Sequence, residues 1–281
     1  MSSTGIAAGV ALSVLSAASL GSADFAGGLA ARTRSALAVV AVMQAIEFVG
    51  VLVLILIIAP PHPSTTTVVC GLFAGAAVAL GLTALYRGLA MGSMAVVAAL
   101  STVGSVAIPF AFSAVVLGTF PHTVQLIGVV IALAASVMMA GLSGRVVSRT
   151  ALLYGLIAAV SFGTYFILLS RGASSGLWVL LTSRGAAVVL LVAVGGATRL
   201  IRVDRGLLPL AVTAGLLELL GSGLVIAALR YLPLGLIVPI TGTYPVATAL
   251  LAWAFLGERL RLFAYLSVAL ALVGIVLIGQ G

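Results

Sequence analysis

Four ionisable side chains stand inside long apolar stretches of the sequence: Asp24, Glu47, Arg184 and Glu218. At the centre of a membrane-spanning helix each costs about 2.5–3.5 kcal/mol, so together they cost on the order of 10 kcal/mol. Such side chains are expected to face the interior of a helix bundle, where they pair with one another or serve a substrate or an ion. They are therefore the first candidates for binding or moving a charged solute.

Glu218 is the most informative of the four. Its neighbours on adjacent helical faces are Gly215, Gly221 and Ser222, and these small residues leave space beside the carboxyl group. A carboxyl group with room for water in apolar surroundings is typical of a proton or cation site. The alternative interpretation is a structural ion pair with Arg184 on the neighbouring span.

Each of the other three ionisable residues also has a structural alternative. Glu47 has Gln44 one turn earlier on the same helical face, so the two either line a polar cavity or bond to neighbouring helices. Asp24 ends a helical stripe of small residues and either lines a cavity or reaches the membrane interface. The planar guanidinium of Arg184 suits a substrate carboxylate, but it equally suits an anchor for Glu218 or a side chain that extends to the interface.

Uncharged polar residues mark three further helical faces. In the stretch 232–256, Thr241, Tyr244 and Thr248 share a face flanked by Pro239 and Pro245. Proline frees backbone carbonyls, which is tolerated in a membrane only where protein or cavity water bonds them. This stretch is therefore expected to bend and to line a pathway, unless its hydroxyls only pack helices together. Similar polar faces occur in the fourth and sixth apolar stretches: Ser101, Thr102, Ser105 and Pro109, and Ser161, Thr164 and Tyr165.

No motif for a metal, a cofactor or a nucleotide occurs in the sequence. The chain has one cysteine, Cys70, and two histidines in short polar segments, so neither a metal cluster nor a nucleophile–base pair is expected. It has no lysine and no phosphate-binding glycine loop. The sequence therefore predicts no enzyme, no cofactor and no direct use of ATP.

The composition requires a membrane environment for these residues. Of 281 residues, 63% are hydrophobic and 6% are charged, whereas soluble domains carry about 25% charged residues. A membrane-spanning helix needs about 20 apolar residues, and the predicted fold is an all-α integral membrane protein with ten such helices. The first stretch has no basic segment before it, so it is expected to be retained rather than cleaved as a signal. The ten stretches are 5–30, 36–59, 67–90, 93–117, 123–142, 150–170, 177–198, 207–230, 232–256 and 262–280.

The basic residues are all arginines and are unevenly distributed. All except Arg171, Arg184 and Arg230 lie in or beside the connectors that follow odd-numbered stretches. Since cytoplasmic loops are enriched in basic residues, this distribution places the odd connectors in the cytoplasm and both termini outside, in a multi-pass protein of the inner (plasma) membrane. We therefore attribute the net charge of +8 to arginines that orient the protein in the lipid bilayer, and we expect no binding of nucleic acid.

The chain divides into two similar halves, 1–145 and 146–281, of five stretches each. The opening stretches share Ser19-Leu20-Gly21-Ser22 and Ser161-Phe162-Gly163-Thr164, and the fourth stretches both end in Leu-Gly, at 117–118 and 256–257. Because five is odd, the second half must enter the membrane in the opposite direction to the first. Inverted repeats of this kind are typical of secondary transporters, which bind substrate near the midplane between the halves.

With these halves and the run Leu256-Gly257-Glu258-Arg259-Leu260 before the last stretch, the chain resembles the EamA family of the drug/metabolite transporter superfamily. The resemblance covers nearly the whole chain and implies a ten-helix transporter with two inverted repeats. A Trp-Gly pair common in the family is replaced here by Leu20-Gly21 and Phe162-Gly163, while Arg184 matches a common arginine in the second helix of a half. Family members have cytoplasmic termini, opposite to the orientation that the arginines predict.

The resemblance implies a secondary transporter that exports a small polar metabolite, such as an amino acid or a related zwitterion, by alternating access. The predicted substrate and coupling residues are Glu218, Arg184, Asp24, Glu47, Tyr165, Tyr244 and Thr241. The predicted cavity lies between spans 1, 3, 4, 6, 8 and 9, with a proton as the candidate coupling ion at Glu218. Acids outnumber bases within the spans, so the alternative is proton-coupled efflux of an organic cation or drug.

Overall fold

The computed structural model describes residues 3–31, 33–90, 94–140, 149–198, 201, 204–256 and 262–280. Within this part of the chain the secondary structure is helical, with no strand. Long apolar runs become helices because an α-helix bonds its own backbone groups and leaves none exposed to lipid. The elements are α1 (Ser3–Ala31), α2 (Ala36–Ile58), α3 (Thr65–Ala90), α4 (Met94–Val115), α5 (Thr123–Ala140), α6 (Arg149–Arg171), the 3-10 helix η1 (Ala173–Ser175), α7 (Gly176–Thr198), α8 (Leu208–Ala228), α9 (Leu234–Thr241), α10 (Tyr244–Leu256) and α11 (Leu262–Gly279).

The predicted all-α fold is confirmed, and the described helices coincide with the ten predicted stretches. Six helical segments are long and apolar enough to cross a membrane, and the four others described are shorter apolar helices. The ninth stretch is broken at Gly242 and Thr243 into α9 and α10, between Pro239 and Pro245. In contrast, α4 continues through Pro109 as one helix, so a proline within a stretch does not by itself divide it.

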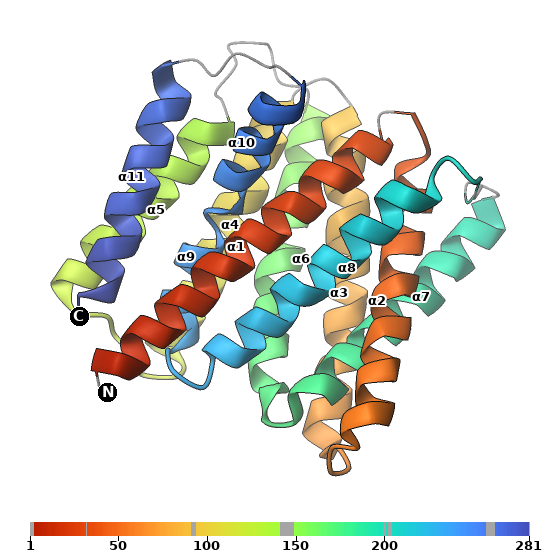
Figure 1. The fold of residues 1–281 in the computed structure, drawn as a ribbon, viewed down its shortest axis with the longest axis horizontal. Coiled ribbons are helices and arrows are strands. Elements are labelled where there is room, and N and C mark those ends of the chain that lie inside the picture. The colour runs from red at the N-terminus through yellow and green to blue at the C-terminus, as the bar shows by residue number, and fades with distance from the viewer. Residues whose placement is uncertain are drawn as a thin grey trace.

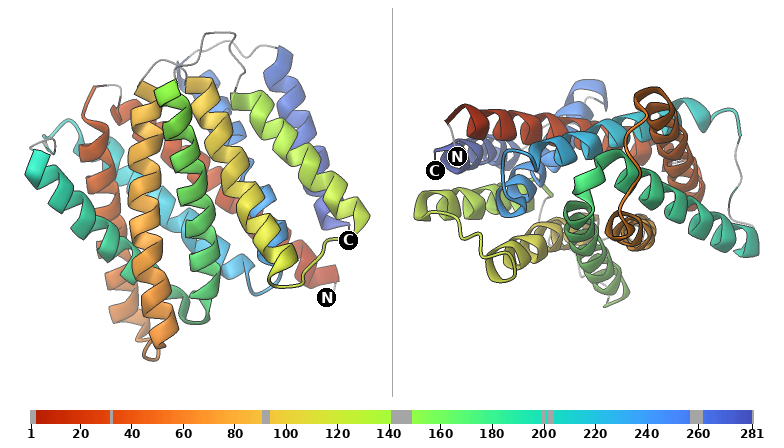
Figure 2. Two further views of the ribbon diagram at one scale, coloured as in Figure 1. Left: turned by 180° about the vertical axis from the view of Figure 1, so that it is seen from behind. Right: turned by 90° about the horizontal axis from the view of Figure 1, so that it is seen from below.

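The helices form two crossing layers. Figure 1 shows α1 and α8 running diagonally across one face, with α3, α6 and α4 behind them. Seen from behind in Figure 2, α5 and α11 pair at one edge and α7 lies at the opposite edge. Both ends of the chain lie at the same end of the bundle, together with the connectors that follow even-numbered spans (Figure 1).

Helices of the first half pack mainly on helices of the second half. The most extensive packing joins α1 to α8, α3 to α6, α4 to α6, and α5 to α11. Small residues permit this close approach: Gly21 of α1 faces the backbone of Tyr244 and Thr248, and Gly163 of α6 faces Ile108 of α4. An inverted duplication would produce this reciprocal arrangement, although the division into two repeats stays a prediction.

An ion pair joins two connectors at the end of the bundle opposite the termini. Arg34 Nε, after α1, lies 2.6 Å from Asp204 Oδ2, before α8. Asp204 Oδ1 also accepts hydrogen bonds from the backbone N–H groups of Gly206 and Leu207. Desolvation raises the pKa of the Asp204 carboxyl, but the hydrogen bonds from Arg34 and from the backbone outweigh it and hold the pKa below its usual value.

Candidate functional site

The Arg184 side chain lies at the centre of a buried polar network. Projecting from α7 with no exposed surface, it donates from Nη2 to Tyr165 Oη at 2.9 Å and to Ser222 Oγ at 2.7 Å. Its Nη1 donates to Gln44 Oε1 at 3.3 Å. The guanidinium carbon also lies 5.5 Å from the centre of the Tyr165 ring, within the range of a cation–π contact. Helices α2, α6, α7 and α8 therefore meet at this one cation.

Two carboxylates compensate the charge of Arg184 unequally. Glu47 Oε2 lies 2.8 Å from Arg184 Nε, whereas Glu218 Oε1 lies 3.8 Å from Nη1. The Glu47 contact is a close ion pair without hydrogen-bond alignment, since neither Nε nor Oε2 has a hydrogen-bond partner in the described structure. The other oxygen of Glu47 accepts a 2.6 Å bond from Gln44 Nε2. Glu47 is therefore the principal counter-ion, and Glu218 is only loosely engaged.

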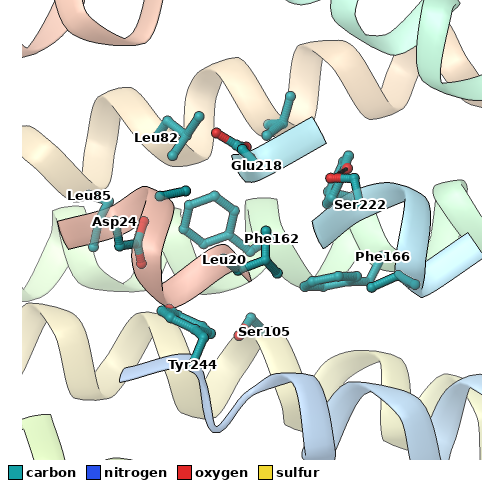
Figure 3. A pocket seen from close by; sticks show the side chains of 14 residues that line it. Leu20, Asp24, Leu82, Leu85, Ser105, Phe162, Phe166, Glu218, Ser222 and Tyr244 are labelled. Carbon is teal, nitrogen blue, oxygen red and sulfur yellow. Dashed lines mark hydrogen bonds between the residues drawn. The ribbon is translucent and has the colours of Figure 1, made fainter. Parts of the chain in front are cut away.

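A cavity of about 80 Å³ lies beside this network. It is bounded by α1, α3, α4, α6, α8 and α10, the six spans predicted to enclose it. Figure 3 shows Asp24, Glu218, Ser222 and Tyr244 arranged around it. The remaining wall is largely apolar; the residues that line the cavity are Leu20, Ala23, Asp24, Val78, Leu82, Leu85, Ser105, Phe162, Tyr165, Phe166, Glu218, Ser222, Val225 and Tyr244.

The charged side chains that line this cavity are both acidic. Asp24 projects from α1 and Glu218 from α8, and Glu218 keeps 13% of its side chain exposed. Among the described residues Asp24 has no cationic partner. Arg184 does not line the cavity, but its hydrogen-bond partners Tyr165 and Ser222 do. The cavity is thus lined by acidic groups, and the Arg184 guanidinium lies behind its wall, bonded to Tyr165 and Ser222.

An apolar cluster lies between the cavity and a second pocket at the end of the bundle that carries the termini. Val106 of α4 packs with Leu234 and Val238 of α9, and Phe166 and Leu229 pack against them. Phe166 also lines the cavity, while Leu229 and Leu234 line a second pocket at the end of the bundle. A solute passing between the two pockets would have to separate these side chains. We call this cluster of five residues the apolar plug.

The structure sorts the predicted site residues into two groups. Asp24, Tyr165, Glu218 and Tyr244 line the cavity. Asp24 therefore faces the cavity and not the interface, which was the alternative left open by the sequence. Tyr244 lies beside Thr102, with their hydroxyl oxygens 3.4 Å apart, so the predicted polar faces of the fourth and ninth spans meet.

The other predicted residues lie outside the cavity wall. Glu47 and Arg184 are fully buried, so the predicted extension of Arg184 to the interface is wrong: its counter-ion and hydrogen bonds hold it inside. Its predicted anchoring of Glu218 is secondary, because Glu47 is closer. Thr241 is 1% exposed and does not line the cavity, and its hydroxyl has no hydrogen-bond partner within the described residues.

The sequence did not single out the apolar wall contributed by Phe166 and by Val78, Leu82 and Leu85 of α3. In a membrane protein both lipid-facing and interior positions are apolar, so these side chains carried no signal of their own. The Gly257–Arg261 connector used for the family resemblance lies outside the described residues.

Comparison with known proteins agrees with this architecture. Residues 149–280 match the sequence model of the EamA-like transporter family. A solved structure titled only "Crystal structure of protein" superposes with a TM-score of 0.80 over 96% of each chain, at 14% sequence identity, which shows a shared fold. No curated protein matches the chain in sequence. The second half of the chain thus matches the EamA-like transporter family in sequence, and the whole chain has a fold that a solved structure shares along nearly its full length.

Proposed function

We propose that this transporter carries a small amine-bearing organic cation in exchange for protons. The observation that carries this proposal is the charge of the central cavity: Asp24 and Glu218 line it, and the nearby Arg184 is already bound to Glu47. A free carboxylate in a low-dielectric site attracts a cation strongly. An ammonium group would therefore be favoured there over a simple carboxylate.

The apolar remainder of the cavity wall indicates the rest of the substrate. Leu82, Leu85, Phe162 and Phe166 surround the acidic groups, and such surfaces favour a hydrocarbon or aromatic moiety. The preferred solute is accordingly an amine that carries a short apolar group.

Coupling to protons follows from competition at one carboxyl group. Glu218 is 3.8 Å from Arg184 and partly exposed to the cavity, so its negative charge is not fully compensated. A proton and an ammonium group each neutralise it, and occupancy by one excludes the other. Opening of the apolar plug in alternation with access from the opposite end of the bundle would turn this competition into exchange by alternating access.

An amino acid remains the second candidate substrate. Ser222 lines the cavity and accepts a 2.7 Å hydrogen bond from Arg184, so a carboxylate near Ser222 would lie close to the buried guanidinium. This observation favours a zwitterion, whose ammonium would approach Asp24 or Glu218.

Three probes that differ in one group separate these candidates in proteoliposomes: 2-phenylethylamine, phenylalanine and 3-phenylpropionate. Counterflow of labelled probe into vesicles preloaded with the same unlabelled probe needs no pH gradient and avoids passive trapping of amines. We expect phenylethylamine to exchange fastest and 3-phenylpropionate not to exchange. Exchange of phenylalanine without phenylethylamine would replace the proposal with amino-acid transport, and exchange of neither would overturn both.

Proton coupling is tested with phenyltrimethylammonium, whose permanent charge moves no protons by itself, and a pH-sensitive dye trapped in the vesicles. Addition of this cation outside should drive protons out of the vesicles containing wild-type protein. Glu218→Gln should abolish this proton flux, and Asp24→Asn should lower cation exchange about tenfold or more because the site loses an uncompensated charge. Asp204→Asn makes the same chemical change in a connector and should behave as wild type. Full proton-coupled exchange by Glu218→Gln would eliminate Glu218 as the coupling group.

A further inference from the structure

A second pocket, of about 470 Å³, opens at the end of the bundle that carries the termini. It lies between the α4–α5, α6–α7 and α8–α9 connectors, beyond the apolar plug. Its charged side chains are two exposed arginines, Arg171 at the end of α6 and Arg230 just after α8. The hydroxyl groups of Thr119, Ser170 and Ser174 also line it. We call these five residues the basic vestibule.

Within the described part of the chain, neither arginine has an acidic side chain with which to pair. Three of the five acidic residues of the chain, Asp24, Glu47 and Glu218, belong to the central cavity and its network. Of the other two, Asp204 pairs with Arg34 at the opposite end of the bundle, and Glu258 occurs by sequence in a connector that follows an odd-numbered span. In the part of the chain that the structure describes, neither guanidinium makes an ion pair or a hydrogen bond.

The donors in this pocket belong chiefly to the arginines. Ser170 donates to the carbonyl of Ile167, and Thr119 donates to the carbonyl of Ser113, so both hydroxyls are already used as donors. Each guanidinium keeps five N–H donors in a planar fork that matches a two-oxygen acceptor. Helix α9 also begins on this wall, at Leu234; its Gly235 N–H already donates to Ser113 Oγ, and its N-terminus adds partial positive charge.

We infer that the basic vestibule binds a phosphate group, held between Arg171 and Arg230. Inorganic phosphate or a phosphate monoester carries close to two negative charges and the phosphodiester of an acidic phospholipid carries one, and either presents oxygen acceptors to the two otherwise unpaired guanidinium groups. The group can belong to a soluble phosphate or to the headgroup of an acidic phospholipid, because the pocket lies at the end of the helices. This inference does not depend on which solute occupies the central cavity.

Binding to the purified full-length protein in a non-ionic detergent tests the inference without any transport measurement. Thermal denaturation is followed in sodium phosphate and in sodium chloride of equal ionic strength. Native mass spectrometry is used in parallel to follow retention of phosphatidylglycerol against phosphatidylcholine. The test variant is Arg171→Gln/Arg230→Gln. The matched control, Arg87→Gln/Arg149→Gln, removes two exposed arginines at the opposite end.

We expect wild type and control to bind one of the two phosphate-bearing probes and the test variant to bind it about tenfold or more weakly. Stabilisation by inorganic phosphate would identify a soluble phosphate as the ligand, and selective retention of phosphatidylglycerol would identify a lipid headgroup. Should the double variant not fold, Arg171→Lys and Arg230→Lys keep the charge, lose the planar fork and should each weaken binding. No binding by wild type, or an equal loss in the control, would overturn the inference.

Discussion

At the scale of single residues, the three intramembrane carboxyl groups differ by their distance from one cation. Glu47 lies 2.8 Å from Arg184, Glu218 lies 3.8 Å away, and Asp24 has no cationic partner in the described structure. A buried guanidinium is costly without a counter-ion, so Glu47 is expected to be structural. Glu218 and Asp24 line the cavity, and we expect these two carboxyl groups to bind the solute and the proton.

Removal of Glu47 alone should therefore destabilise the protein more than removal of both charges. Glu47→Leu leaves the buried guanidinium of Arg184 without its closest partner and should cost about 3–5 kcal/mol, whereas Glu47→Leu/Arg184→Met should recover a large part of that loss. Thermal denaturation in detergent measures both variants. Glu218→Gln is the control because its contact with Arg184 is longer. Equal losses for Glu47→Leu and Glu218→Gln would contradict the assignment of Glu47 as principal counter-ion.

At the scale of elements, the break between α9 and α10 brings Tyr244 to the cavity and leaves Thr241 outside it. Gly242 and Thr243 separate the two helices, and α10 starts at Tyr244, directly against Gly21 of α1. The Thr248 hydroxyl donates to the Gly21 carbonyl at 2.9 Å. The contact between α1 and α10 thus sets the positions of both Tyr244 and Asp24, one turn from Gly21.

Two glycines of α1 make this contact testable. The added methyl group of Gly21→Ala would lie 2.7 Å from the Cβ of Ala247 and nearer still to the Tyr244 carbonyl. We expect this overpacking to destabilise the protein by about 1–3 kcal/mol. Gly28 has no atom within 4 Å of such a methyl group, so Gly28→Ala should be neutral or stabilising by up to about 1 kcal/mol. The melting temperatures of the two variants in detergent test this expectation. Equal changes in melting temperature for Gly21→Ala and Gly28→Ala would refute the close α1–α10 contact.

At the scale of the whole molecule, the arginines are distributed unequally among the connectors of the chain. By sequence, all thirteen arginines except Arg171, Arg184 and Arg230 occur in or beside connectors that follow odd-numbered spans, and the described ones among them lie at the end opposite the termini. The charge asymmetry predicts that this arginine-rich end faces the cytoplasm. The basic vestibule would then face outward.

Single cysteines at the two ends test the orientation in intact cells. In a Cys70→Ser background, Ser174→Cys lies at the end of the termini and Thr33→Cys at the arginine-rich end, and both positions are exposed. We expect a membrane-impermeant maleimide to label Ser174→Cys directly and Thr33→Cys only after permeabilisation. The reverse pattern would show cytoplasmic termini, as the family resemblance implies, and would mean that charge distribution does not set the orientation of this chain.

The sequence by itself determined the number and order of the spans, their approximate limits, and which of them carry buried charge. These features are local: about 20 consecutive apolar residues specify a span, and an ionisable residue inside a span must turn inward. It also identified the six spans around the cavity, through the polar residues that most of them carry.

Only the tertiary structure decided which side chains meet. Arg184 pairs with Glu47 and only loosely with Glu218, Asp24 faces the cavity, and α3 supplies an apolar wall that the sequence did not single out. These outcomes depend on how each helix is rotated and on which helix of the other half it contacts. A span that is apolar on every face does not encode its rotation, because lipid and protein interior are equally apolar surroundings.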